Sequence, residues 1–282
     1  IDHISSHTGG VVSVASPIRV RFTRNLADSL TAAPPENLFS FSPAIPGTAQ
    51  WEDSRTLIFQ PEGLLNGDEE YQATLRLVEV LPDIEADKEQ FKFVFRTLVQ
   101  NFEVELVGLK YDSATDLTKM KLEGVLQTAD IFPANQLESL IQASQQGQTL
   151  AVSYGEQTTD NSIPFTVTNV TRADKESSVR LTIDGDQIGV DREDEIDISV
   201  PALGEFSITS HHIIRGRENY ISVLFSDPLD PRQNLNGLVS LSTSSSAPRL
   251  VVDLNELKIY PTSTFSEDVE LDLSFLGPGM YL

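Results

Sequence analysis

The chain has 282 residues, 42 of them acidic and 20 basic, which gives a formal net charge of -22 at pH 7. Such a charge repels polyphosphates and anionic lipid surfaces, so nucleic-acid binding and polybasic membrane binding are not expected. The sequence contains no cysteine, which excludes a disulfide, a thiolate zinc site, an iron–sulfur cluster and a cysteine nucleophile within these residues. The length is too great for one small core and suits two or three domains of about 100 residues each.

The predicted elements are almost all β-strands, because apolar and polar residues alternate along short segments. The alternating apolar positions are Ile18, Val20 and Phe22; Phe39 and Phe41; Leu57 and Phe59; Phe91, Phe93 and Phe95; Phe102, Val104 and Leu106; Met120 and Leu122; Phe165 and Val167; Val179, Leu181 and Ile183; Ile196, Ile198 and Val200; Ile221, Val223 and Phe225. Gly, Pro, Asn and Asp separate these segments about every ten residues, which is typical of stacked antiparallel β-sandwiches.

Residues 133–146 depart from this alternation. Their apolar side chains Leu137, Leu140 and Ile141 fall at i, i+3 and i+4, the spacing of one face of a helix. A proline opens the segment and a glycine follows it, as at the ends of many helices. The pattern predicts a short amphipathic helix that buries its apolar stripe against a sheet.

Three blocks of the early sequence recur late in the chain in the same order. The blocks are 17–26, 55–61 and 71–75, and their later counterparts are 220–229, 255–261 and 269–273. Each copy carries an aromatic residue shortly before a proline, Phe59 with Pro61 and Tyr260 with Pro261, although the offset differs by one residue between the two pairs. Matched blocks in one order indicate two copies of one fold.

The copies are separated by a segment that is not repeated, so we predict domains at residues 1–98, 99–208 and 209–282. We expect the first and third domains to superpose as similar sandwiches. Leu271 and Leu273 still alternate close to the last residue, which leads us to expect a fragment of a longer protein whose third domain is truncated.

No residue is predicted to be catalytic, to bind a cofactor or to hold a metal. The four histidines, His3, His7, His211 and His212, lie near a terminus or next to one another, so we expect solvated or linker side chains. The sequence has no GxSxG, HExxH, phosphate-binding glycine loop or dinucleotide fingerprint.

The acidic run 184–195 invites comparison with a twelve-residue calcium loop. Asp184 fills its first position and Glu195 its twelfth, but Ile188 and Arg192 stand where oxygen ligands belong. Both flanks alternate like strands. We therefore expect a tight turn followed by a solvated acidic hairpin, with calcium binding as the alternative.

Several longer segments carry a family resemblance. They are Ser16–Phe22, Phe39–Gly47 and Trp51–Pro61, with a second set at Leu224–Leu229 and Asn234–Val239. The first set resembles the Ig-like domain at the amino end of bacterial α2-macroglobulins, particularly Bacteroidetes-type lipoprotein members, and the second set is similar to another copy of it. The resemblance implies a mostly β fold of tandem antiparallel Ig-like and macroglobulin-like β-sandwiches, with one short helix in the middle domain.

The resemblance also implies a function. In this family a protease cuts a bait region, the molecule collapses around the protease, and in many members an internal Cys–Gln thioester acylates the trapped enzyme. Such proteins are implied to lie in the bacterial cell envelope, periplasmic or surface-exposed, with a lipid anchor that here would lie upstream of Ile1. Their implied partners are proteases and a peptidoglycan-synthesising penicillin-binding protein, in a role of host defence.

This chain departs from the active pattern of the family. The thioester motif reads Cys-Gly-Glu-Gln, and the nearest text is Tyr154-Gly155-Glu156-Gln157. Tyrosine cannot supply the thioester sulfur. We therefore expect a non-catalytic amino-terminal scaffold whose bait region and thioester lie outside this fragment.

The alternative is a cell-surface adhesin or glycan-binding module built from Ig-like domains, because β-sandwiches host many functions. A glycan-binding module needs an exposed aromatic platform. Trp51 is the only tryptophan, and we expect it to be packed in a core or at a corner of the fold.

Overall fold

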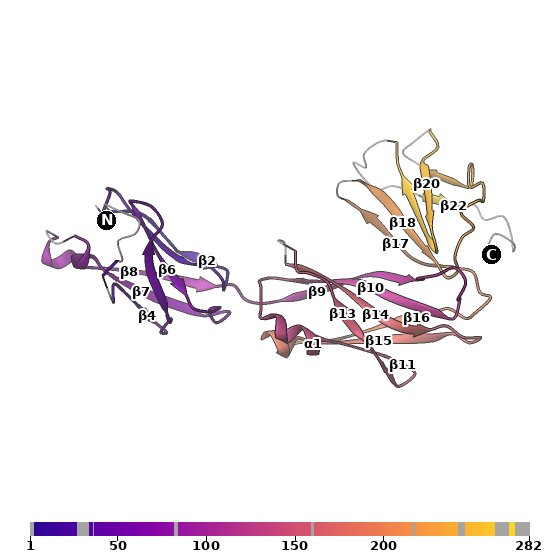
Figure 1. Ribbon diagram of the computed structural model, residues 1–282, viewed down its shortest axis with the longest axis horizontal. Helices are drawn as coiled ribbons and strands as arrows, with labels where there is room; N and C mark the ends of the chain where they lie inside the picture. The colour runs from indigo at the N-terminus through magenta and orange to yellow at the C-terminus, as the bar shows by residue number, and fades with distance from the viewer. Residues whose placement is uncertain are drawn as a thin grey trace. The chain divides into compact units, whose positions relative to one another are not determined.

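The computed structural model describes residues 3–26, 34–35, 37–81, 84–158, 161–215, 218–241, 246–262 and 271–273 (Figure 1). Within these residues the strands form five four-stranded sheets and one two-stranded sheet. The predicted fold class is confirmed: the protein is mostly β, with antiparallel sheets stacked in tandem. No helix in the described ranges has the length and apolar character needed to cross a bilayer.

The chain divides into two compact units. The first contains Ile1–Phe102, Thr128–Ala134 and Ile188–Val190, and the second contains Glu103–Gln127, Asn135–Gln187 and Asp191–Leu282. The finer division at 1–98, 99–208 and 209–282 stays a prediction. For description, the sheets of residues 4–97, 102–200 and 208–273 are called the first, second and third sandwiches.

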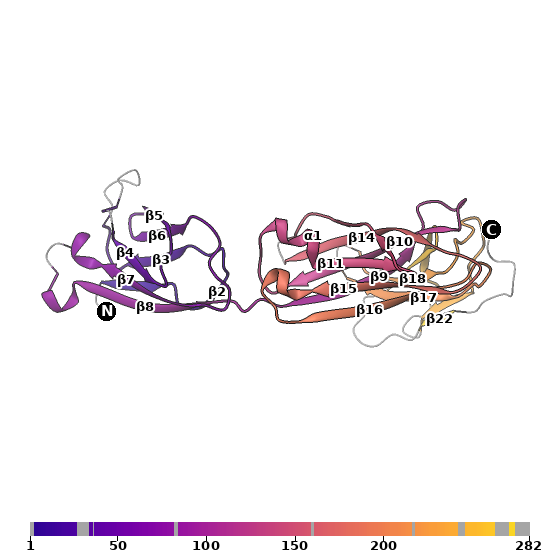
Figure 2. The same cartoon turned by 90° about the horizontal axis from the view of Figure 1, so that it is seen from below.

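Two sheets make the first sandwich, drawn in indigo to magenta (Figure 2). One has the order β1 (Ile4–His7), β3 (Ile18–Phe22), β6 (Thr56–Pro61) and β5 (Gly47–Trp51). The other has the order β2 (Gly10–Val12), β8 (Gln90–Thr97), β7 (Glu70–Arg76) and β4 (Phe39–Ser42), with β2 parallel to β8. Two short 3-10 turns, η1 (Leu77–Glu79) and η2 (Ala86–Lys88), precede β8. Every second residue of β3 and β8 is buried in the shared core, as the alternation predicted.

Residues 128–134 belong to the first unit and contribute a buried carboxylate to it. Asp130 is 2% exposed. Its carboxylate accepts hydrogen bonds from Ser13 Oγ at 2.6 Å and from the Val14 backbone N–H at 2.7 Å. The desolvated carboxylate is therefore satisfied by donors from the segment after β2.

Two further sheets make the second sandwich. One has the order β13 (Val152–Tyr154), β14 (Ser162–Thr171), β10 (Lys119–Thr128) and β9 (Phe102–Lys110). The other has the order β12 (Gln148–Leu150), β11 (Ile141–Gln145), β15 (Ser177–Asp184) and β16 (Glu193–Val200). The turn η4 (Gly185–Ile188) links β15 to β16.

The helix predicted over residues 133–146 is wrong beyond Leu140. The helical part consists of η3 (Ala134–Gln136) and α1 (Leu137–Leu140), after which the chain becomes the strand β11. The spacing of the three apolar residues therefore describes one helical turn and the start of a strand.

Two features of the sequence hid this strand. Gln145 is polar but buried, because its amide donates to Thr171 O at 2.6 Å and accepts from Thr171 N at 2.8 Å. Gln146 and Gly147 both have positive φ and form the two-residue turn of the β11–β12 hairpin. The glycine that resembled a helix end is thus a hairpin residue, and the β-ladder with β15 outweighs the helical spacing.

The third sandwich repeats the strand order of the first. Its four-stranded sheet has the order β17 (Ile208–Ile214), β18 (Tyr220–Phe225), β21 (Glu256–Tyr260) and β20 (Arg249–Asp253). This order matches β1-β3-β6-β5 of the first sandwich, so that β17 corresponds to β1, β18 to β3, β21 to β6 and β20 to β5. The two-stranded sheet of β19 (Val239–Leu241) and β22 (Leu271–Leu273) matches the β4–β7 pair.

The repetition extends to single hydrogen bonds. Phe22 N donates to Arg55 O at 2.8 Å, and Phe225 N donates to Asn255 O at 2.9 Å. Likewise, one β-bulge lies between Ile4 and Ser6 and another between Ile208 and Ser210. A hydroxyl side chain bonds to the neighbouring strand at each bulge: Ser5 Oγ to Arg21 O at 3.1 Å, and Thr209 Oγ1 to Leu224 O at 3.2 Å.

The strand register identifies equivalent residues in the two copies. Ile18 pairs with Phe59 in the first sandwich, and the equivalent Ile221 pairs with Ile259 in the third. The structural counterpart of Phe59 is therefore Ile259. Tyr260 is one residue further along, so its side chain lies on the opposite face of the strand from that of Ile259.

Candidate functional site: a polar joint between two sandwiches

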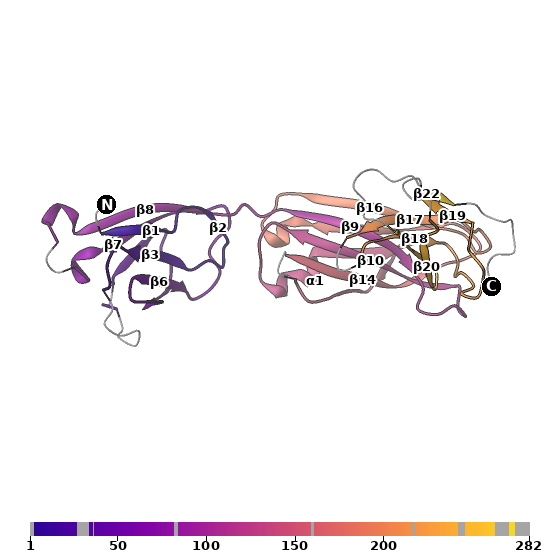
Figure 3. The same cartoon turned by 90° about the horizontal axis from the view of Figure 1, so that it is seen from above.

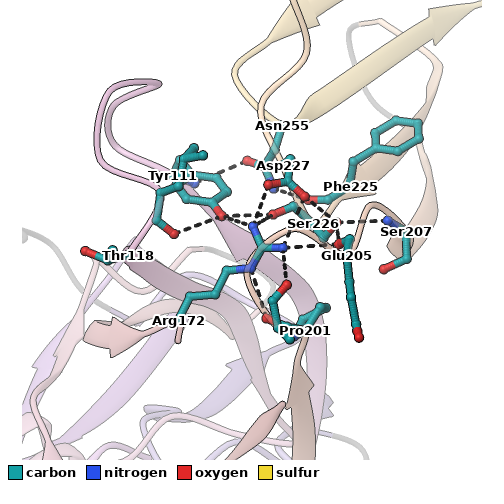
Figure 4. A network of polar contacts seen from close by, with 12 residues as sticks. Tyr111, Thr118, Arg172, Pro201, Glu205, Ser207, Phe225, Ser226, Asp227 and Asn255 are labelled. Carbon is teal, nitrogen blue, oxygen red and sulfur yellow. Dashed lines mark hydrogen bonds and ion pairs between the residues drawn. The ribbon is translucent and has the colours of Figure 1, made fainter. Parts of the chain in front are cut away.

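Arg172 follows β14 and is the largest completely buried side chain in the described part of the chain. Its guanidinium reaches the third sandwich, where Nη1 donates to Asp227 Oδ1 at 2.7 Å and Nη2 to Asp227 Oδ2 at 3.1 Å (Figure 4). This two-point geometry is the strongest arrangement between a guanidinium and a carboxylate. Both sandwiches belong to the second compact unit.

Backbone carbonyls complete the surroundings of the guanidinium. Nε donates to Pro201 O at 2.9 Å, Nη2 to Ala202 O at 2.7 Å and to Glu205 O at 3.1 Å, and Nη1 to Ser226 O at 2.7 Å. The first three carbonyls come from the segment that connects β16 to β17. Arg172 therefore joins the second sandwich, the third sandwich and the segment that connects them.

Tyr111 adds a second bridge beside the arginine. Its hydroxyl donates to Ser226 O at 2.8 Å and accepts from Arg172 Nη1 at 2.8 Å. Burial raises the pKa of the Tyr111 phenol, and the hydrogen bond from Arg172 opposes that rise. Burial by itself lowers the pKa of Arg172, but its hydrogen bonds to Asp227 and Tyr111 raise it above the usual value. The joint thus holds a neutral phenol and a charged guanidinium.

The side chain of Asn255 links the end of β9 to β18 through hydrogen bonds. Its Nδ2 donates to Leu109 O at 2.9 Å and to Phe225 O at 2.7 Å, while its Oδ1 accepts from Tyr111 N at 3.2 Å. The side chain is 1% exposed. One amide therefore satisfies backbone groups of both sandwiches where water is excluded.

A line of alternating charges crosses the same interface. Lys110 Nζ lies 3.2 Å from a Glu123 oxygen of the second sandwich and 3.3 Å from a Glu256 oxygen of the third. The other oxygen of Glu256 accepts from Ser222 Oγ at 2.6 Å. Glu256 is only 5% exposed, so these partners supply the compensation that a buried carboxylate requires.

Close backbone packing accompanies these polar contacts. In Figure 3, seen from above, β17 and β18 lie over β9 and β10, and Ser210 Oγ of β17 donates to Val107 O of β9 at 2.9 Å. Gly108 lies at this contact with φ +126°, and a Cβ there would be 2.5 Å from Ser210 Oγ and 2.8 Å from Leu224 Cδ1. Only glycine fits this approach without displacement of its neighbours.

The face of β18 that packs against the second sandwich has an exposed equivalent on β3 of the first sandwich. Arg19 and Arg21 occupy the positions equivalent to Ser222 and Leu224, and their side chains are 49% and 48% exposed. In the third sandwich Ser222 is 2% and Leu224 0% exposed. The same face of the repeated sheet is thus a solvated, charged surface in one copy and an interface in the other.

The histidines do not assemble into a site. His7 packs its ring 5.2 Å from Phe91 and 5.1 Å from Phe93, centroid to centroid. His211 and His212 are successive residues of β17, and His212 Nε2 is buried without a hydrogen-bond partner among the described residues. The expectation of a solvated side chain therefore fails for the Nε2 atom of His212, whereas the residue as a whole is half-buried. Within the described ranges, no group of three or more His, Asp or Glu could hold a metal ion.

The acidic run 184–195 forms a turn between two strands. Asp184 Oδ1 accepts from Asp186 N at 3.2 Å, and Asp184 Oδ2 accepts from Gln187 Nε2 at 2.7 Å. Gly185 N donates to Arg192 O at 2.9 Å. The strand character of both flanks is confirmed, and the Asp184 carboxylate serves to close the η4 turn.

Two other residues singled out in the sequence have structural positions. Trp51 is half-buried against the first core, with its ring 6.0 Å from that of Phe22. Tyr154, in the text nearest to the thioester motif, accepts a hydrogen bond from Ile141 N at 3.3 Å, and burial raises the pKa of its phenol. The packed position predicted for Trp51 is confirmed.

The sequence matches no protein-family model, and no curated protein matches it. Among solved structures, L,D-transpeptidase 3 from Mycobacterium tuberculosis has 15% identity and a TM-score of 0.27 over 71% of this chain and 74% of its own. Domains 4–9 of the surface-layer protein SbsC have 9% identity and a TM-score of 0.39 over 98% of this chain and 46% of their own. The ectodomain of mouse nectin-like molecule 4 has 13% identity and a TM-score of 0.29 over 90% of this chain and 87% of its own. At these scores none of them carries an argument about this chain's activity.

Proposed function

We propose that this chain is the non-catalytic amino-terminal scaffold of an envelope α2-macroglobulin that traps and inhibits proteases. The reactive thioester and the bait region would lie outside these residues. Proteases would be partners of the full-length protein, with a peptidoglycan-synthesising penicillin-binding protein as a neighbour and a lipid anchor upstream of Ile1. The chain itself would not be an enzyme.

The observation that carries this proposal is the joint around Arg172. A scaffold that positions a distant reactive part must resist bending, and flexible linkers between domains do not. Here one buried guanidinium binds both sandwiches and their connection, and Asn255 and Glu256 add further buried bonds. The buried polar groups of this joint are therefore all directed at protein atoms, which supports a mechanical role.

The motif segments that carry the family resemblance support the proposal in a second way. Ser16–Phe22 includes the strand β3, and Leu224–Leu229 begins with the last two residues of the equivalent strand β18. The two segments therefore meet at equivalent positions of the repeated sheets, which supports the view that the second set is another copy of the first.

The proposal is tested by mixing the chain, and separately the full-length protein encoded by its gene, with trypsin. Digestion of a large protein substrate and of a small chromogenic peptide is then measured. A protease enclosed by a trap is cut off from large substrates but still reached by small ones. We expect the full-length protein to suppress only digestion of the large substrate, and the 282-residue chain to suppress neither.

Inhibition by the chain alone, or failure of the full-length protein to inhibit, would overturn the proposal. A gene that ends without further domains and without a Cys-Gly-Glu-Gln segment would also overturn it, and would favour an adhesin or glycan-binding module.

A further inference from the structure

A groove of about 450 Å³ opens beside the joint, within the second compact unit. Its apolar lining includes Leu106 of β9, Ile198 of β16 and Ile208 of β17. Ile208 is 43% exposed. The groove therefore presents apolar surface from three different strands to solvent.

Each of those strands lies at the edge of its sheet. The sheet orders are β13-β14-β10-β9, β12-β11-β15-β16 and β17-β18-β21-β20. The outward backbone groups of an edge strand have no ladder partner and can pair with an added strand.

Of β16 and β17, β16 is the more regular edge along the groove. It pairs with β15 through eight consecutive residues, from Asp184↔Glu193 to Ser177↔Val200, without a register shift. In contrast, β17 is interrupted by the bulge between Ile208 and Ser210. An unbroken edge offers evenly repeated donors and acceptors, so β16 is the better template.

The charge of the groove determines which side chains an added strand should carry. Its lining contains the carboxylates of Glu176, Asp197 and Glu205 and no lysine or arginine. Asp197 is paired with Arg180, and Glu176 accepts a hydrogen bond from Ser199. The Glu205 carboxylate has no hydrogen bond or ion pair with the described residues, because only its backbone carbonyl takes part in the joint.

We propose that this groove binds an extended peptide segment that carries lysine or arginine at alternate positions and adds as a strand to the free edge of β16. Side chains of an extended peptide alternate between two faces. One set would lie over Leu106, Ile198 and Ile208, and the other would approach Glu176 and Glu205. This inference goes beyond the scaffold function and does not depend on it.

The test titrates the whole chain with three hexapeptides of equal length and follows binding by calorimetry. The first is Lys-Val-Lys-Val-Lys-Val with blocked ends, the second replaces every lysine by glutamate, and the third is the lysine peptide with alternate peptide nitrogens methylated. We expect binding only by the first, with slower deuterium exchange of the β16 amides. Equal binding of the methylated peptide would overturn the proposal, because methylation removes strand pairing and keeps the charge.

Matched variants separate the groove from the general acidity of the chain. Glu176→Gln with Glu205→Gln removes two exposed carboxylates from the groove, while Glu62→Gln with Glu138→Gln removes two exposed carboxylates elsewhere. We expect the dissociation constant to rise about fivefold in the groove variant and to stay unchanged in the control. An equal rise in both variants, or none in the groove variant, would overturn the proposal.

Discussion

Arg172 and Asp227 form a buried two-point ion pair that joins the second sandwich to the third, with Nη1–Oδ1 at 2.7 Å and Nη2–Oδ2 at 3.1 Å. The arginine side chain is 0% exposed and the aspartate side chain 10% exposed. If one partner is removed, the charge of the other stays largely shielded from water. The pair is therefore the part of the joint at which a single substitution should cost most.

Arg172→Met should destabilise the chain by about 3–5 kcal/mol, because it leaves the Asp227 carboxylate buried without its cation. Urea unfolding measures the loss. The matched control is Arg180→Met, which breaks the exposed pair with Asp197 and should cost no more than about 1 kcal/mol. Equal costs for the two variants would contradict the assignment of Arg172 as the anchor.

Replacing both partners should cost less than replacing one. Arg172→Met with Asp227→Leu removes the uncompensated charge, so we expect the double variant to regain stability relative to Arg172→Met. The same urea experiment gives the coupling free energy. Additive losses would show that the two side chains act independently.

Gly108→Ala should weaken the contact between the sandwiches. The new Cβ would meet Ser210 Oγ and Leu224 Cδ1, and φ +126° is a conformation that alanine rarely adopts. We expect a loss of about 1–3 kcal/mol in the free energy of unfolding. Gly63→Ala serves as the control, because a Cβ at Gly63 would meet no atom within 4 Å, so the free energy of unfolding should hardly change.

The joint should weaken in alkali. The pKa of Tyr111 is raised from 10.0, first by burial. Its contribution to stability is therefore complete below the pKa of the unfolded chain and is lost as the pH rises through the folded-state value. Melting temperatures measured from about pH 8 to 11 should fall above about pH 10.

Tyr111→Phe should reduce that alkaline fall, and at neutral pH it should cost about 1 kcal/mol for the lost hydrogen bonds. The pKa of Tyr154 is raised as well, so Tyr154→Phe measures how much of the fall arises away from the joint. If the melting temperature of Tyr111→Phe falls in alkali as steeply as that of the unaltered chain, the loss of stability arises from groups other than Tyr111.

Calcium should not stabilise the 184–195 turn, because Asp184 already accepts hydrogen bonds from Asp186 N and Gln187 Nε2. Calcium at about 100 µM, which saturates sensor-type loops, should leave the melting temperature unchanged. A rise that Asp184→Asn abolishes would revive the calcium interpretation.

Much of the fold could be predicted from local patterns. The alternation in β3 and β8 predicted their buried faces, since one side of a half-buried strand must be apolar. The pattern failed at β11, where the polar Gln145 is buried because Thr171 satisfies its amide. Burial of a polar residue depends on a partner 26 residues away, which no local period records.

The joint could not be predicted in the same way. Arg24 and Asp227 occupy equivalent positions after β3 and β18, and the first is exposed while the second is buried. A comparison of the two copies flags this charge reversal, but it does not identify Arg172, which lies outside the repeat. The partner of Asp227 is known only once the second sandwich is folded against the third.

The amino-acid order alone determined the β class, the alternating strands such as β3 and β8, and the duplication, because these follow from side-chain periodicity and from recurrence along the chain. Tertiary structure alone decided that one repeated face is covered while the other stays in water, and that Arg172 anchors the covered one. The physical reason is that desolvating a charge is favourable only when its counter-charge is brought to it, and segments distant in sequence meet only in the folded state.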